Sequence, residues 1–190
     1  MLESLLTEIR QCTVCEPHLP LGANPVIRAH PAAKILIIGQ APGTKVHNTS
    51  IPWNDASGER LRQWLGLDRE AFYCEENIAI MPMGLCYPGK GRSGDLPPRK
   101  ECAPLWHAKV LEQLPNRQLT LLIGQYAQHY YLSDKPSTLT ETVQQWQRWG
   151  PSVLPLPHPS PRNTLWLKNH PWFEQDIVPY LRQRVKQVLT

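Results

Sequence analysis

The sequence predicts a three-layer α/β/α fold with a central four-stranded parallel sheet. Two short aliphatic runs, at 34–39 and 119–124, have the continuous hydrophobicity of strands that are buried on both faces. Segments with helical spacing alternate with such runs, which is typical of a parallel sheet with helices on both faces. A chain of 190 residues has room for one such core. We therefore expect a single domain over residues 1–190.

The first half of the chain supplies two of the expected strands and two helices. Leu2, Leu5, Leu6 and Ile9 recur at helical spacing, which predicts that the chain opens with a short helix. The strand at 34–39 leads through a loop into a helix over about 57–65, which ends at Gly66 because glycine accepts the left-handed cap conformation. A second strand is expected near 77–81.

The next segment begins with a long loop over 82–98 that is rich in glycine and proline. A helix follows and reaches about Leu114, before the third strand at 119–124. Another helix then extends through Tyr131. This alternation keeps the third strand parallel to the first two.

The last segment contains one strand between two helices. Residues 138–141 read Thr-Leu-Thr-Glu, a capping box that predicts a helix ending near Trp149. A short fourth strand is expected at 152–156. The chain then ends in a helix from about Pro171, in which Pro179 should introduce a kink because proline removes a helical hydrogen bond.

Composition and charge narrow the class of protein. Apolar residues make up 41% and charged residues 19%, which is a globular rather than a disordered composition. The net charge of +4 permits contact with nucleic acid without requiring it. No run approaches the roughly 20 apolar residues that span a bilayer, and residues 1–10 do not read as a signal peptide. We therefore expect a cytoplasmic protein whose cysteines are thiols or metal ligands rather than disulfides.

Two loop motifs carry the strongest functional signal. Gly-Gln-Ala-Pro-Gly at 39–43 follows the first strand, and His-Pro-Ser-Pro-Arg-Asn at 158–163 follows the last. Both lie at the carboxyl ends of strands, where α/β folds bind their ligands. The pair resembles the two signature motifs of the uracil-DNA glycosylase superfamily. The resemblance implies a DNA glycosylase of base excision repair, which hydrolyses the N-glycosidic bond of uracil or a related deaminated base.

The resemblance combines features of different branches of the superfamily. The second motif is closest to the single-strand-selective branch, whereas the cysteines and the first loop resemble the iron–sulfur prokaryotic branches. In the best-known branch an acid stands where this chain has Ala41. An Asp-Ala-Ser-Gly segment at 55–58 resembles the segment in which one iron–sulfur branch places a catalytic aspartate.

These matches imply three catalytic residues. His158 would donate a hydrogen bond to the departing base, Asp55 would assist the attack of water, and Gln40 would hold water or the flipped base. Each has a simpler alternative. Asp55 could be only a helix N-cap, His158 a loop histidine that binds a backbone carbonyl, and Gln40 a strand-end residue that satisfies backbone groups.

The remaining pocket residues are also implied by the resemblance. We expect the base to bind against the segment containing Ala41, the ring of Trp53, and backbone groups of Met83 and Gly84. Many relatives have an asparagine where alignment places Pro82, so a base other than uracil, such as hypoxanthine or xanthine, is also a candidate substrate. The residues expected to contact DNA are Ser160, Arg162 and Asn163.

Four cysteines match a cluster-binding pattern. The resemblance to the iron–sulfur branches implies that a [4Fe–4S] cluster is bound by Cys12, Cys15, Cys86 and Cys102. The alternatives are zinc, because Cys-x-x-Cys fits either metal, or no metal. Cys74 has no counterpart and is expected to be a packed thiol.

The expected partner is DNA that contains a damaged or deaminated base. We expect a monomer that does not associate with membranes. Two other functions remain open. Ala41 and Pro82 could mark a superfamily member that binds DNA or a modified nucleotide without excising the base, or the pocket could hydrolyse free nucleosides or nucleotides.

Overall fold

The central sheet consists of four strands in the order β2–β1–β5–β6. The computed structural model describes all of residues 1–190. Strand β1 (Ile35–Ile38) pairs with β2 (Ile78–Ile80) on one side and with β5 (Leu119–Ile123) on the other, and β5 pairs with β6 (Val153–Leu156). All three pairings are parallel, which confirms the predicted sheet.

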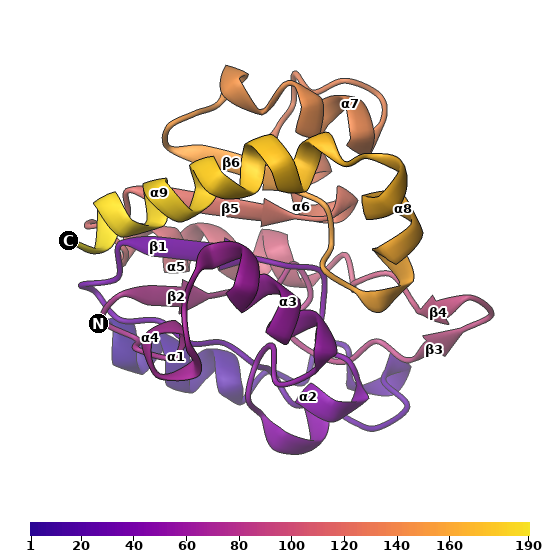
Figure 1. The fold of residues 1–190 in the computed structure, drawn as a ribbon. Coiled ribbons are helices and arrows are strands. Elements are labelled where there is room, and N and C mark those ends of the chain that lie inside the picture. The colour runs from indigo at the N-terminus through magenta and orange to yellow at the C-terminus, as the bar shows by residue number, and fades with distance from the viewer.

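The two faces of the sheet form two separate apolar cores, as the aliphatic strands require. Ile35 and Ile37 pack into one core, whereas Leu36 and Ile38 pack into the other. Figure 1 shows α3 and α9 in front of the sheet and α5 and α6 behind it. The helices of the first core are α3 (Ala56–Leu65), α4 (Arg69–Phe72), α7 (Leu139–Gln144), α8 (Thr164–Asn169) and α9 (Val178–Leu189). Those of the second core are α1 (Leu2–Arg10), α5 (Ala108–Glu112) and α6 (Gln125–Tyr131).

Helix boundaries follow the capping residues that the sequence indicated. Asp55 caps the amino end of α3, and Gly66 ends that helix with a φ of 70°. The Thr138 side chain accepts a hydrogen bond from the Glu141 N–H and opens α7 as predicted. Helix α7 is shorter than expected, and a 3-10 turn at Trp146–Arg148 follows it.

The structure adds regular elements where the sequence predicted loops. Helix α2 (Thr44–Thr49) lies inside the loop after β1. The Gly- and Pro-rich loop contains a hairpin of β3 (Lys90–Gly91) and β4 (Gly94–Asp95). Figure 1 shows this hairpin projecting beyond the sheet, on the side opposite both chain termini.

The carboxyl-terminal segment is one continuous helical run from Trp172 to Leu189, close to the helix that the sequence predicted from about Pro171. It is π-helical over Phe173–Ile177 and continues as α9, so the departure from regular α-helix lies directly before Pro179, which lacks the N–H for a helical hydrogen bond. Helix α9 packs on α3, where the Arg182 guanidinium donates hydrogen bonds of 3.0 and 2.7 Å to the Gln63 carbonyl. None of the helices is both long and apolar enough to cross a membrane.

Candidate active site

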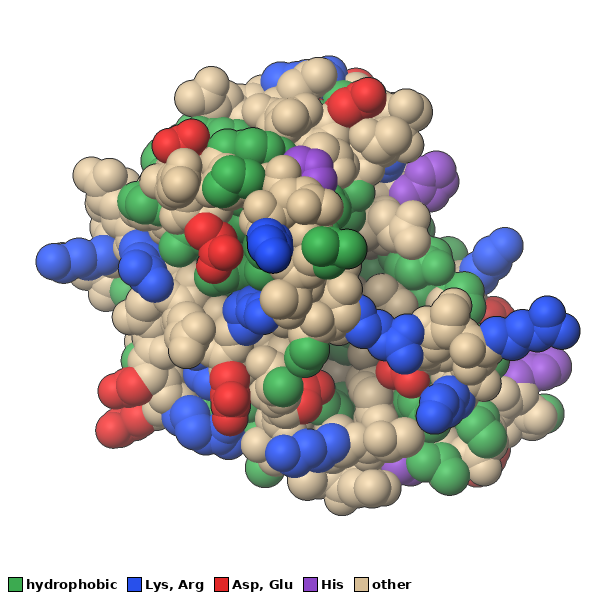
Figure 2. Space-filling view, turned by 45° about the vertical axis from the view of Figure 1, so that its right-hand side comes forward, with side chains coloured by type: hydrophobic (Ala, Val, Ile, Leu, Met, Phe, Trp, Pro, Cys, Tyr) green, Lys and Arg blue, Asp and Glu red, His purple; other side chains and the backbone are tan.

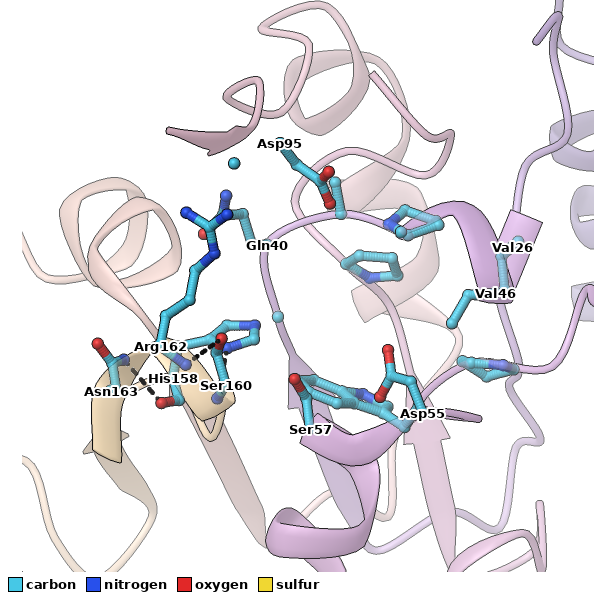
Figure 3. Close-up of a pocket in the computed structure, with 18 of the residues that line it drawn as sticks. Val26, Gln40, Val46, Asp55, Ser57, Asp95, His158, Ser160, Arg162 and Asn163 are labelled. Carbon is cyan, nitrogen blue, oxygen red and sulfur yellow. Dashed lines mark hydrogen bonds between the residues drawn. The ribbon is translucent and has the colours of Figure 1, made fainter. Parts of the chain in front are cut away.

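A pocket of about 400 Å³ lies beyond the carboxyl ends of the strands. Such folds place ligand sites at this edge because the loops that follow parallel strands converge there. Figure 3 shows side chains from separate loops facing one central space. The predicted residues on its wall are Gln40, Ala41, Trp53, Asp55, His158, Ser160, Arg162 and Asn163. The structure therefore brings together both loop motifs and the Asp-Ala-Ser-Gly segment.

The Trp53 ring forms one wall of the pocket and lies directly on the backbone of the first motif. A Cβ added to Gly39 would stand 2.8 Å from this ring, so the glycine is what allows the close approach. The ring also faces His158, with the two ring centroids 5.6 Å apart and an angle of 34° between the planes. Trp53 has a φ of 60°, which is rare for a bulky residue and indicates a conformation imposed by its surroundings.

Helix α3 holds Trp53 in this conformation. The Arg62 side chain is buried (5% exposed), and its Nη1 donates a 3.0 Å hydrogen bond to the Trp53 carbonyl. Arg62 also donates to the Tyr73 hydroxyl, which donates to the Pro52 carbonyl at 2.7 Å. Gly58 packs under the same turn, where an added Cβ would lie 1.7 Å from the Trp53 carbonyl oxygen. Hydrogen bonds therefore hold the turn at Trp53, and the missing side chain of Gly58 leaves room for it.

The His158 ring has one defined tautomer when it is neutral. Its Nδ1 accepts a 3.1 Å hydrogen bond from the Ser160 N–H, so the ring proton is on Nε2. Burial lowers the pKa of His158 to about 4, although the nearby Asp55 carboxylate opposes this shift. The Asn163 side chain donates to the His158 carbonyl at 2.8 Å and braces the same loop (Figure 3). At neutral pH the ring is therefore an uncharged donor.

Asp55 both caps helix α3 and lines the pocket. Its Oδ1 accepts a 2.9 Å hydrogen bond from the Gly58 N–H, so it is the N-cap that the simpler alternative proposed. It also lines the pocket, on the opposite side from His158 in Figure 3. The capping bond leaves the other carboxylate oxygen available for other contacts.

Met83 and Gly84 are the two expected base-binding residues that the structure does not bring to the pocket wall. The Met83 N–H donates to the Gly39 carbonyl at 2.9 Å, and the Gly84 N–H donates to the Gln40 carbonyl at 3.0 Å. These donors hold the first motif in place instead of facing a ligand.

Pro82 lines the pocket next to that segment, and its carbonyl is held by the buried His107, which in turn contacts the partly buried Tyr131. Since a carbonyl only accepts, the 2.9 Å contact with His107 Nε2 means that Nε2 bears the proton. Nδ1 then accepts from the Tyr131 hydroxyl at 2.5 Å. Burial lowers the pKa of His107 to about 4, so this chain of hydrogen bonds is uncharged at neutral pH.

The β3–β4 hairpin closes one side of the pocket, and no sequence pattern indicated this hairpin. Arg162 of the second motif donates to the Ser93 carbonyl at the hairpin tip, so the two loops touch across the pocket. Lys90 and Asp95 of the hairpin also line the wall. Burial raises the pKa of Asp95, with Arg162 and Lys90 opposing the shift. With only two residues per strand, the hairpin offers no hydrophobic alternation from which it could be predicted.

The second-motif loop is also attached to α3. Arg60 donates to the Ser160 carbonyl at 3.1 Å and to the Thr164 hydroxyl at 3.2 Å. The Ser160 hydroxyl accepts from the Arg162 N–H at 3.1 Å and caps the short turn that follows. Figure 2 shows lysine and arginine side chains spread around the hollow on this face, without one continuous basic patch.

Four cysteines line a second, small cavity whose lining includes no residue of the first pocket. Cys12, Cys15, Cys86 and Cys102 share it with Arg99 and Trp106 among others, whereas Cys74 is not part of it. All five cysteines are free thiols. Burial raises the pKa of Cys86 and of Cys102 to about 11. No three His, Cys, Asp or Glu side chains lie in an arrangement that could hold a single metal ion.

Comparison with known proteins agrees with the geometry of the pocket. Residues 28–182 match the family described as the uracil DNA glycosylase superfamily. A relative from Thermotoga maritima, named type-4 uracil-DNA glycosylase, is 23% identical over 162 residues, which cover 84% of this chain and 82% of the relative. The family match includes Cys86 and Cys102 but begins after Cys12 and Cys15.

Proposed function

The chain belongs to the uracil-DNA glycosylase superfamily, and from this premise we propose that it excises uracil or a related deaminated base from DNA in base excision repair, with residues 1–190 acting as one domain. The observation that carries the proposal is one pocket that combines a neutral histidine donor, a carboxylate and an aromatic face. Cleavage of an N-glycosidic bond requires each of these groups.

The pocket binds a base that has been flipped out of the DNA stack. The base stacks on the ring of Trp53, an interaction worth about 1–3 kcal/mol. Gln40 and Ala41 line the pocket beside it, and the Gln40 amide offers both a donor and an acceptor to the base edge. Ser160, Arg162 and Asn163 surround the pocket and contact the DNA strand.

His158 and Asp55 perform the chemistry. As the bond between C1′ and the base nitrogen breaks, the bonding electrons leave with the base, and the Nε2–H of His158 donates a hydrogen bond to the resulting anion. Asp55 supports the positive charge on the sugar and orients a water that adds to C1′. The water oxygen bonds to C1′ and its proton leaves toward Asp55, which gives a free base and an abasic site.

Cys12, Cys15, Cys86 and Cys102 would hold a [4Fe–4S] cluster. Their placement around one cavity fits such a group. A tetrahedral zinc site, with Zn–S bonds of about 2.3 Å, needs its four sulfurs within about 4 Å of one another, whereas a cluster binds each thiolate through a separate iron. The cluster would join the amino-terminal segment to the loop that follows β2, and its main contribution would be to stability.

The test uses duplex and single-stranded oligonucleotides that carry uracil, hypoxanthine or xanthine, incubated with cluster-loaded protein. We expect an abasic product from at least one of them. Absence of product on every substrate, with an intact cluster, would overturn the enzymatic proposal. Since Ala41 lacks the usual acid, binding without cleavage would identify a recognition protein, and activity only on free nucleosides would identify a nucleoside hydrolase.

A further inference from the structure

Two residues that line the cavity of the four cysteines each have a buried N–H donor without a partner. These are the Nε of Arg99 and the Nε1 of Trp106, and both residues line the cavity. Buried donors in proteins are nearly always satisfied, so an unsatisfied pair on one cavity points to an acceptor that belongs there. A neutral thiol is a weak acceptor, whereas the thiolates and sulfides of an iron–sulfur cluster are negatively charged and accept well.

The fold holds both donors at the cavity. Gly84 lies under the chain at Pro98 and Arg99, where an added Cβ would stand 2.9 Å from the Pro98 side chain and 3.2 Å from the Arg99 nitrogen. Trp106 belongs to a π-helical stretch, Ala103–His107, that begins directly after Cys102, and π-turns are frequent at functional sites. Only 5% of Trp106 is exposed.

Arg99 has an acidic residue on its outer side and a cysteine on its inner side. On its outer side, Arg99 Nη2 forms a 2.7 Å ion pair with Glu101 Oε2, and both side chains are partly exposed. On its inner side the guanidinium faces Cys15. Arg99 and Cys15 line the same cavity, whereas Glu101 does not line it. The charges of Arg99 and Glu101 therefore act in opposite directions on negative charge at the cavity.

We propose that Arg99 and Trp106 donate hydrogen bonds to sulfur atoms of the cluster and, through the Arg99 charge, set its reduction potential. This rests on the proposed cluster. Reduction adds one electron, and therefore one negative charge, to the cluster. Positive charge and N–H donors at the sulfurs stabilise that reduced form and raise the potential. Glu101 limits this effect because its carboxylate partly neutralises the guanidinium.

The experiment measures the one-electron reduction potential of the holoprotein by mediated spectroelectrochemistry, after iron content and absorbance near 400 nm have been determined. We expect Arg99→Met to lower the ratio of reduced to oxidised cluster about tenfold at a fixed potential, which is about 59 mV. Trp106→Phe keeps the ring but removes the N–H, and it should shift the potential in the same direction by less. Glu101→Gln should shift it in the opposite direction.

Lys186→Met is the matched control, since it removes one exposed positive charge from α9 and should leave the potential unchanged. Equal potentials in all four variants and the wild type, with iron present, would overturn this inference and leave the proposed cluster intact. Shifts of the same sign in Arg99→Met and Glu101→Gln would also overturn it. A wild-type protein without iron would overturn the cluster itself. Because Glu101 does not line the cavity, its variant remains informative if Arg99→Met fails to load iron.

Discussion

Replacing Asp55 with asparagine should separate its catalytic role from its structural one. The carboxylate accepts a 2.9 Å hydrogen bond from the Gly58 N–H at the start of α3. Asparagine caps helices about as well as aspartate, so we expect Asp55→Asn to keep the stability of the wild type. Asp55→Ala should lose the cap, at about 1 kcal/mol, which lowers Tm by about 2–4 °C in a chain of this size.

The two variants should behave alike in catalysis. Loss of a positioned carboxylate costs about 10²–10⁴ in rate, and we expect this loss in Asp55→Asn as well as in Asp55→Ala. Protonation of His158 cannot cause the loss, because Asp55 raises the pKa of that ring and removing the charge would only lower it further. The measurement is the single-turnover rate of abasic-site formation, with enzyme in excess over a labelled oligonucleotide.

Asp68 provides the matched control. It caps α4 with a 2.8 Å bond from the Ala71 N–H, and it does not line the pocket. Asp68→Asn should leave both Tm and rate unchanged. If Asp55→Asn excises the base at the wild-type rate, Asp55 is only a helix cap and the mechanism proposed above is wrong.

Three further predictions concern the same pocket. His158→Ala should reduce the single-turnover rate by about 10²–10³, and a rate within twofold of the wild type would exclude it as the donor. Gly58→Ala should lower Tm and weaken binding of DNA that contains the base, because the new Cβ would overlap the Trp53 carbonyl; calorimetry that shows an unchanged Tm would contradict this packing. The free energy of unfolding should decrease as the pH is lowered from about 6.5 to 4. Burial lowers the pKa of His107 and of His158 to about 4 in the folded protein, so the unfolded chain binds more protons than the folded one in this range. The free energy of unfolding can be measured by urea titration at several pH values. In His158→Gln it should depend less steeply on pH than in the wild type, by up to about 1.4 kcal/mol per pH unit. An equal dependence on pH in both proteins would count against a buried neutral ring.

The parts of the fold that could be predicted are those with a local signal. The aliphatic runs at 34–39 and 119–124 became β1 and β5 because burial on both faces requires uniform hydrophobicity. The ends of α3 were visible in Asp55 and Gly66, whose capping chemistry is confined to neighbouring residues. The hairpin at 90–95 had no such signal, because its strands are too short to show a pattern.

Most of the residues that line the pocket could be predicted from the sequence, but the hydrogen bonds that hold them could not. The two motifs and Trp53 could be identified from the sequence, and the structure places them on one pocket. The hydrogen bond from Arg62 to the Trp53 carbonyl could not be predicted, since arginine on a helix gives no indication that it will be buried. The bond between Arg162 and Ser93 joins residues far apart in the chain and depends on the hairpin. Long-range contacts of this kind arise from tertiary packing, which a local pattern does not encode.

The packing of α9 on α3 has a consequence for the growing chain. Helix α3 carries the arginines that fix Trp53 and the second-motif loop, and Asp55 caps it, yet it is covered by α9, which is synthesised well after it. At typical elongation rates α9 leaves the ribosome on the order of 10 s after α3. A nascent or truncated chain can thus pair all its strands while the helix beneath the pocket is still uncovered. A chain cut before α9 would therefore lack the packing and the Arg182 hydrogen bonds that hold α3 under the pocket.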